Sequence, residues 1–434
     1  MQVLKLARSE SHTPPNLDSP DLLLEKALAL ALPSSPVRRP PLASTTERCI
    51  TRRGAIWLGQ TCNLRCHFCF FIDRIEDASH PEHEFMSLEK AKRICKILVD
   101  VYGNNAVDIQ GGEPTLWRPI LALIEYCHAI GLHPSLITNA LLLDRKEKLL
   151  EYKKAGIRDF LVSVHGLGPV HDWAVGLDGA HERQMKALRN LIEVGIPFRL
   201  NTVLTGGSIL HLPQVARLAT ETGARVVNFL TFLPFADQAT AGARTAPNLP
   251  RYSEAAGPLT EALDLLSAAG VEANVRFFPL CLLPARHRKS CFNLQQLPYD
   301  QGEWDFASLS WTSQQPQRMK TGELSPPSEL AREGRPEWLH SLARRLTAFP
   351  RLRHIVTRGS REQSYREFAR GMARGTGYTY GPGCNGCDAG GICDGIHGDY
   401  AAMFGTEEVR PIKLGFRAKD PTLYIRQQSK IAYS

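Results

Sequence analysis

The alternation of hydrophobic and polar residues predicts repeated strand–helix units between Gly54 and Phe278. Short β-branched or apolar runs alternate there with longer segments whose apolar residues recur at helical spacing, which is typical of a parallel sheet covered by helices. The predicted strands are Ala55–Leu58, Ala106–Gln110, Ser135–Thr138, Phe160–Val164, Phe198–Val203 and Val226–Leu230. The predicted helices lie near Leu88–Val101, Ile120–Ile130, Asp144–Ala155, Glu182–Val194 and Leu212–Thr222. Six such units indicate an α/β fold, a partial (β/α)6 TIM-like barrel, with functional residues in the loops that follow the strands.

This rhythm is absent at both ends of the chain. Residues 1–53 are rich in Pro and Ser and predict a mobile N-terminal arm, with one short amphipathic helix over Leu22–Ala31. The barrel, residues 54–278, ends with a helix near Ser253–Ala269 and an extended run from Val275. Residues 279–434 are rich in Arg, Gly, Pro and polar residues, and we assign them to a C-terminal extension with a cysteine-rich loop.

The composition and the length of the apolar stretches indicate where in the cell the protein is expected. The longest apolar stretch, residues 22–33, contains two charges and is much shorter than the roughly 20 residues of a membrane span. No secretory signal is apparent, so we expect a cytoplasmic protein without a membrane partner, in which the eleven cysteines are reduced. The net charge of +8 is modest, and the densest basic run, Arg332 to Arg374, is either a solvated face or a site for an anionic substrate or RNA.

Three cysteines, Cys62, Cys66 and Cys69, lie within eight residues directly after the first predicted strand. Thiolates are the soft ligands that iron–sulfur clusters need. Three of them would hold three irons of a cubane and leave the fourth iron open to a small molecule. A zinc site is the alternative, although zinc usually takes four ligands.

The C-x3-C-x2-C spacing, with Phe68 before the last cysteine, resembles the motif of the radical SAM superfamily. Gly111, Gly112 and Glu113 follow the second strand and resemble the family's GGEP segment, which contacts the methionine amino group of S-adenosylmethionine. The resemblance implies a [4Fe–4S] cluster with an open iron, to which S-adenosylmethionine binds. It also implies an enzyme that cleaves this cofactor reductively, usually to a 5′-deoxyadenosyl radical that abstracts a hydrogen from the substrate.

Two further residues are implicated by the same resemblance. Ser163, at the end of the fourth strand, matches a position that commonly binds S-adenosylmethionine, and Asn201 on the fifth strand matches the ribose-side or substrate-side wall. Either residue is alternatively a polar side chain satisfied locally at the mouth of the barrel. His165 and the His171-Asp172 pair either face the same site or bond to nearby backbone.

A second cysteine group, Cys384, Cys387 and Cys393, lies in a loop rich in glycine. It resembles the start of the C-x2-C-x5-C-x3-C element of SPASM and twitch extensions, but position 397 is His where that element has Cys. We expect one auxiliary [4Fe–4S] cluster, with its fourth ligand from Cys281, Cys291, His397 or the substrate. A zinc ion held by the three cysteines and His397 is the alternative.

These features resemble the branch that contains the molybdenum-cofactor GTP cyclase and the peptide-modifying SPASM enzymes. We therefore expect radical chemistry in biosynthesis on a small metabolite or a ribosomally made peptide, with an electron donor such as flavodoxin or ferredoxin. RNA modification is an alternative suggested by the basic run, but no accessory RNA-binding fold is apparent and we expect no nucleic-acid partner. An iron–sulfur electron carrier is the non-enzymatic alternative, against which the open iron argues. The motifs name no catalytic side chain.

Overall fold

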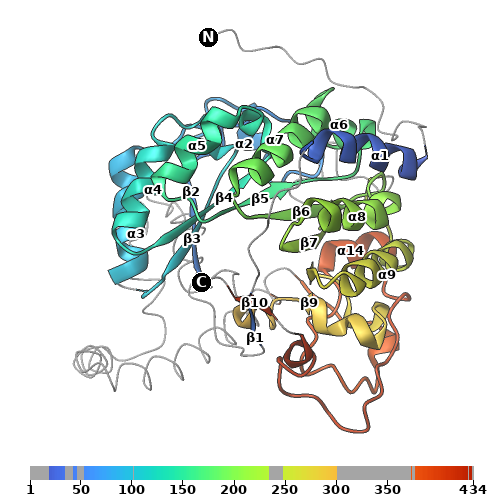
Figure 1. Cartoon of the computed structure of the whole chain (residues 1–434). Coiled ribbons are helices and arrows are strands. Elements are labelled where there is room, and N and C mark those ends of the chain that lie inside the picture. Colours follow the sequence, from blue (N-terminus) through green and yellow to red (C-terminus); the bar gives the residue numbers. More distant parts are fainter. Residues whose placement is uncertain are drawn as a thin grey trace, which may run out of the picture.

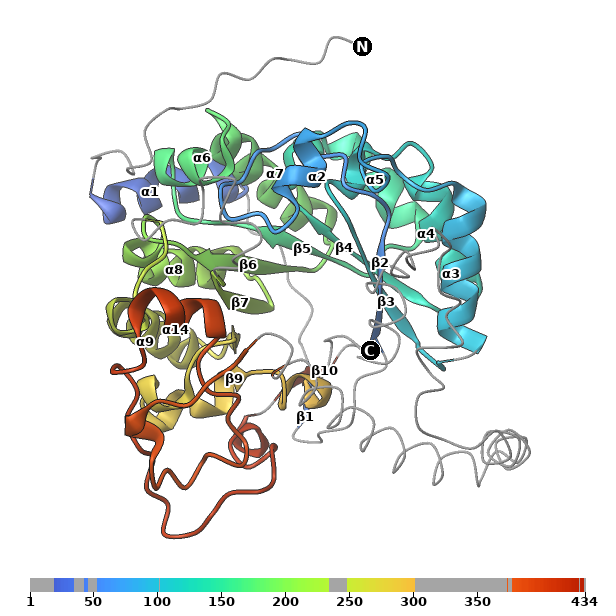
Figure 2. The same cartoon turned by 180° about the vertical axis from the view of Figure 1, so that it is seen from behind.

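Eight parallel strands form one curled sheet, a half-barrel whose outer face is covered by helices (Figures 1 and 2). The computed structural model describes residues 19–34, 43–45, 53–100, 102–233, 248–300, 373, 377–428 and 430–432. The strands lie side by side in chain order: β2 (Arg53–Trp57), β3 (Ala106–Gln110), β4 (His133–Thr138), β5 (Asp159–Ser163), β6 (Phe198–Leu204), β7 (Val226–Thr231), β8 (Glu272–Arg276) and β9 (Cys291–Phe292). The predicted α/β partial barrel is confirmed, and two strands beyond the six predicted extend it.

The helices connect successive strands in the right order for a parallel sheet. They are α2 (Ile72–Glu76), α3 (Leu88–Asp100), α4 (Ile120–Ala129), α5 (Lys146–Ala155), α6 (Pro169–Val175), α7 (Ala180–Val194), α8 (Leu212–Thr222) and α9 (Tyr252–Ala268). Strands β3 and β8 are buried along their whole length, as expected for strands covered on both faces. None of the described helices has the length and apolar character needed to cross a membrane.

The predicted helix within the N-terminal arm is present as α1 (Pro20–Ala31) and packs against α7 and α8 (Figure 1). Ser19 caps it by accepting a hydrogen bond from the backbone of Leu22, and Pro20 occupies the first turn, where a missing N–H costs nothing. Its apolar face is buried in the main core. The expectation of a mobile arm therefore does not hold for this helix.

The predicted boundary at residue 278 is too early for the sheet, because β9 belongs to it; the part of the C-terminal extension from residue 377 onward lies beside α9 and β9 (Figure 1). It contains α14 (Gly398–Phe404) and long loops, and β10 (Lys430–Ala432) pairs antiparallel with β1 (Ala43–Thr45). The carboxylate of Asp394 accepts a hydrogen bond from the backbone of Leu294, which follows β9, at 2.6 Å. This hydrogen bond joins the loop that carries the second cysteine group, residues 384–393, to the end of the sheet.

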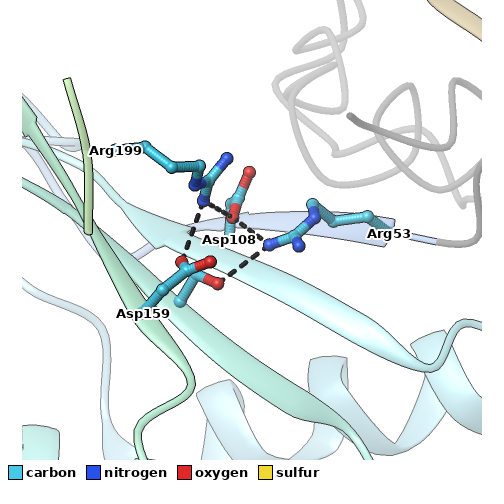
Figure 3. A network of polar contacts seen from close by, with 5 residues as sticks. Arg53, Asp108, Asp159 and Arg199 are labelled. Carbon is cyan, nitrogen blue, oxygen red and sulfur yellow. Dashed lines mark hydrogen bonds and ion pairs between the residues drawn. The ribbon is translucent and has the colours of Figure 1, made fainter. Parts of the chain in front are cut away.

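A buried ion network fills the interior of the half-barrel near the amino-terminal ends of the strands (Figure 3). Arg53 on β2 lies 2.7 Å from the carboxylate of Asp108 on β3, and Arg199 on β6 lies 3.0 Å from Asp159 on β5. The second bond of Arg53 goes to Ser135 on β4 at 2.9 Å. Because each charge is withdrawn from water, loss of one partner would leave an uncompensated buried charge.

We predict that Asp159→Asn lowers the free energy of unfolding by about 3 kcal/mol at neutral pH. Burial alone would raise the pKa of Asp159, but Arg199 and Arg53 outweigh it and hold that pKa below its ordinary value of 3.8. The stabilisation is therefore present above that value and is lost as the pH falls through the lowered pKa. Urea unfolding from neutral to acidic pH checks this, with Asp178→Asn at an exposed position as the matched control. Equal stabilities of the two variants would contradict the prediction.

Candidate functional site

The first cysteine group lies in the loop after β2, at the carboxyl end of the sheet. Cys62, Cys66 and Cys69 line one cavity of about 210 Å³. The predicted residues Phe68, Gly111, Gly112, Glu113 and Ser163 line the same cavity. Asn201 is half-buried on β6, paired in register with Ser163, and is not among the residues that line it. The structure thus brings together all of these predicted residues except Asn201.

Two glycines allow the cysteine loop to lie directly against the end of β3. The backbone N–H of Gly112 donates to the carbonyl of Gly59 at 2.8 Å, and that of Glu113 donates to the carbonyl of Thr61 at 2.9 Å. A Cβ atom at Gly112 would lie 2.1 Å from the Thr61 carbonyl oxygen. Gly111 has a φ of +150°, and a Cβ there would lie 2.3 Å from the Gly59 carbonyl oxygen. These positions therefore require glycine to keep the two segments in contact.

The buried carboxylate of Glu113 organises the neighbouring strand end. It accepts hydrogen bonds from the hydroxyl of Thr138 at 2.7 Å, from the backbone of Asn139 at 2.8 Å and from Thr115. Burial raises the pKa of Glu113, and these hydrogen bonds oppose the rise. Asn139 then donates from its side-chain amide to Asn63 in the cysteine loop at 2.8 Å. Glu113 therefore links the ends of β3 and β4 to the loop that carries the cysteines.

Gln184 is a supporting residue that the sequence analysis did not identify. Its side-chain amide, fully buried on α7, donates to the carbonyl of Ser163 at 2.7 Å and to that of Asn139 at 3.1 Å. It therefore fixes the ends of two strands from the outer helix layer. A glutamine inside an amphipathic helix carries no sequence signal that separates such a role from simple exposure.

The histidines that follow β5 divide into two roles. His165 lines the cavity, with its ring 4.4 Å from that of Phe68. Its Nδ1 accepts from the backbone of Val203, and burial lowers the pKa of His165 to about 3, so the neutral ring carries its proton on Nε2. His171 instead accepts from the backbone of His165, and Asp172 accepts from the backbone of His181. Only His165 of this group therefore faces the cavity.

The thiols of the first cavity lie in surroundings that disfavour their ionised form. Burial, followed by the nearby Glu113 carboxylate, raises the pKa of Cys62 to about 12. Burial, and then Cys69 and Cys62, raise the pKa of Cys66 well above its ordinary range. A bound metal centre supplies the positive charge that makes such thiolates stable. Backbone N–H groups of Leu64 and Phe71 point at Cys62 Sγ and Cys69 Sγ, at 3.5 and 3.4 Å.

The second cysteine group lines a separate cavity of about 320 Å³ in the C-terminal extension. Cys384, Cys387 and Cys393 line it together with Cys281, which lies far earlier in the chain. Backbone N–H groups of Ile412 and Gly395 donate to Cys387 Sγ and Cys393 Sγ at 3.3 and 3.4 Å. Burial raises the pKa of Cys393 to about 12. Four thiols from two distant segments therefore face one space.

The other two side chains considered as a fourth ligand are engaged elsewhere. The thiol of Cys291 is buried and donates to the carbonyl of Phe278 at 3.3 Å. His397 is the N-cap residue that precedes α14, and its Nδ1 accepts from the backbone of Asp399 at 3.3 Å. Neither residue is among those that line the second cavity.

Both donor sets suit a polyatomic cluster. The thiols of each group lie around the wall of one cavity and not at a single point. A set composed of sulfur donors alone also matches the preference of iron–sulfur clusters.

Comparison with known proteins agrees with this chemistry. Residues 58–219 match the radical SAM superfamily. The AdoMet-dependent heme synthase of Oleidesulfovibrio alaskensis is 26% identical over 43% of this chain and 46% of its own length. The GTP 3′,8-cyclase of Peptoclostridium acidaminophilum is 34% identical over 34% of this chain and 44% of its own. The PqqA peptide cyclase of Bradyrhizobium diazoefficiens is 27% identical over 38% and 42%. The chain thus spans less than half of the length of each of these relatives.

We predict that Gly112→Ala displaces the cysteine loop and lowers the iron content of the first cavity at least twofold, since a methyl group cannot lie 2.1 Å from a carbonyl oxygen. Iron analysis after anaerobic reconstitution, together with the melting temperature, measures the effect. Gly257→Ala, at a helical glycine with open space around its Cβ position, is the control and should leave both values unchanged or slightly raised. An iron content equal to that of the unaltered protein would contradict the prediction.

Proposed function

We propose that this chain, which carries a radical SAM domain over residues 58–219, is a radical SAM enzyme that cleaves S-adenosylmethionine reductively. The observation that carries the proposal is the shared cavity of Cys62, Cys66, Cys69 and the Gly111–Glu113 turn. Three thiols there supply too few ligands for all four irons of a cubane, which leaves one iron for a small molecule. An electron carrier would ligate every iron, so the arrangement favours an enzyme.

In this proposal Cys62, Cys66 and Cys69 hold a [4Fe–4S] cluster. When bound together, the cluster and S-adenosylmethionine supply one-electron cleavage of a carbon–sulfur bond and hence a carbon radical. Phe68, Gly111, Gly112, Glu113 and Ser163, which line the cavity, are the proposed residues for S-adenosylmethionine. Asn201, predicted for the same role, pairs with Ser163 in the sheet but does not line the cavity, so we do not propose a direct contact for it.

The chain's own contribution is positioning and exclusion of water. Glu113 holds the ends of β3 and β4 in place against the cysteine loop, and Gln184 holds the end of β5. The apolar wall that includes Leu64, Val203 and Phe232 shields the cavity from water. The neutral His165 presents a hydrogen-bond donor from the same wall.

The second cavity is proposed to hold an auxiliary [4Fe–4S] cluster ligated by Cys281, Cys384, Cys387 and Cys393. Four thiols line the cavity, so each iron would have a protein ligand. We infer that no iron of this auxiliary cluster is left open to the substrate, whereas the first cluster keeps one iron open to S-adenosylmethionine. Zinc coordination through His397 is disfavoured because that residue does not line the cavity and its Nδ1 accepts a backbone hydrogen bond.

The proposed substrate is a small metabolite or a ribosomally made peptide, and the proposed location is the cytoplasm. The names of the relatives support this range, since they include a GTP cyclase and a peptide cyclase. The basic run from Arg332 to Arg374, which prompted the alternative of RNA modification, lies almost wholly outside the described residues. The physiological electron donor is proposed to be a flavodoxin or ferredoxin.

We predict that Cys62→Ala, Cys66→Ala and Cys69→Ala each reduce 5′-deoxyadenosine formation at least 100-fold and lower the iron content from about eight to about four atoms per chain. The assay uses anaerobically purified protein with dithionite and S-adenosylmethionine. Cys95→Ala, which removes a thiol between α3 and α4 beside Cys127, is the control and should retain cleavage. Failure of the unaltered protein to cleave S-adenosylmethionine, or retained cleavage in the three variants, would overturn the proposal.

Cys281→Ala should release iron from the second cavity, because it removes one of four thiols, whereas His397→Ala should leave the iron content unchanged. Iron, sulfide and zinc analysis of both variants distinguishes the two ligand sets. Stoichiometric zinc that is lost in His397→Ala would contradict the assignment of the second cavity to an auxiliary cluster.

A further inference from the structure

A basic exposed surface covers the second cavity. Its segment, residues 410–419, contains Arg410, Lys413, Arg417 and Lys419 and no acidic residue, and all four cations are exposed. Phe416 lies among them with 56% of its surface exposed. We call this segment the basic loop. An exposed aromatic side chain surrounded by cations is typical of a surface that binds a partner.

The basic loop is held in one conformation by the cysteine loop beneath it. The carboxylate of Asp388 accepts from the backbone of Leu414 at 2.6 Å and of Gly415 at 3.1 Å. The backbone of Asp388 exchanges hydrogen bonds with Ile412 and Ala418, both at 2.8 Å. Lys413 donates to the carbonyl of Gly386 at 2.8 Å. The exposed cations therefore project from a backbone that is already ordered, which reduces the conformational entropy that the loop would lose on binding a partner.

The inner side of the basic loop contacts the thiols. The backbone of Ile412 donates to Cys387 Sγ at 3.3 Å, and Arg410 and Arg417 are among the residues that line the second cavity. A molecule bound on the outer side would thus be separated from the four thiols by the thickness of one loop. This proximity favours a partner whose purpose is to exchange electrons with that cavity.

The charge of the loop indicates which partner fits. The carboxylate of Asp388, whose charge is felt by Lys413 and Arg417, bonds to the backbone of the loop, so one nearby carboxylate faces four cations. An acidic protein surface would complement these cations and be steered toward them at a rate that falls with salt. The exposed ring of Phe416 would then be covered at the centre of the contact.

We propose that the basic loop is the docking surface for a small acidic electron-transfer protein, which reduces this chain through the second cavity. The proposal rests on the auxiliary site proposed above. One electron passes per encounter: the bound protein is oxidised by one electron and this chain is reduced by one.

The test compares two double variants that change the net charge equally. Lys413→Glu with Lys419→Glu reverses two charges on the basic loop, and Lys90→Glu with Arg93→Glu reverses two exposed charges on α3, at the opposite end of the molecule (Figure 1). The probe is a reduced acidic flavodoxin. Its Kd is measured by calorimetry at low and high salt, and 5′-deoxyadenosine formation is measured with this flavodoxin and separately with dithionite.

The basic-loop variant is expected to bind flavodoxin at least tenfold more weakly and to lose flavodoxin-supported turnover by a similar factor. Its dithionite-supported turnover should match that of the unaltered protein, and the α3 variant should match it in every assay. Lys413→Gln with Lys419→Gln keeps a donor for the Gly386 carbonyl and should give a smaller loss in the same direction if the charge reversal disturbs folding.

Equal flavodoxin affinity in the two variants would overturn the docking proposal. So would a labelled RNA that binds the basic loop in high salt and displaces flavodoxin, because the surface would then belong to a nucleic acid. Absence of dithionite-supported cleavage in the unaltered protein would refute the proposed enzyme function instead, while the calorimetric comparison still decides whether the flavodoxin docks at this loop.

Discussion

The first cavity depends on the close approach of two backbone segments, the cysteine loop after β2 and the glycine turn after β3. Gly112 leaves room for the carbonyl of Thr61, and the backbone of Glu113 bonds to that carbonyl. From there the Glu113 carboxylate reaches Asn139, whose amide returns to Asn63 in the cysteine loop. The hydrogen bonds form a closed ring around the ends of three chain segments. Displacement of one member would therefore disturb all three.

The two ends of the half-barrel have different tasks. The amino-terminal end contains the buried network of Arg53, Asp108, Asp159 and Arg199, in which charges neutralise one another and leave little for a ligand. The carboxyl end contains thiols, backbone amides and a neutral histidine that face a cavity. This division is common in barrels of parallel strands, where one end secures stability and the other carries chemistry. It explains why polar residues inside the sheet are not all candidates for the site.

Much of this arrangement could be predicted from the sequence, because local patterns reflect local causes. The strand–helix rhythm identified six strands, and the loops after them contained the residues that meet at the first cavity. The two-residue strand β9 is too short for a hydrophobic pattern, and its partner β8 begins three residues before the predicted run. Helix α1 was predicted as a helix, but its attachment to α7 and α8 depends on tertiary packing. The supporting role of Gln184, and the fact that Cys281 and not Cys291 lines the second cavity, likewise depend on which distant segments lie together. The spacing of residues along the chain does not encode this.

The second cavity takes its donors from both sides of a long stretch of chain. Cys281 lies in the connection between β8 and β9, and the other three thiols follow roughly a hundred residues later. A cluster bound there would cross-link the two ends of this stretch. By the chain-entropy argument for cross-links, such loop closure contributes on the order of 4 kcal/mol to the free energy of unfolding. Cluster insertion would then be a folding event as well as a redox one, and a cell short of iron would accumulate a chain whose cysteine loop, residues 384–393, is less stably folded and more open to proteases.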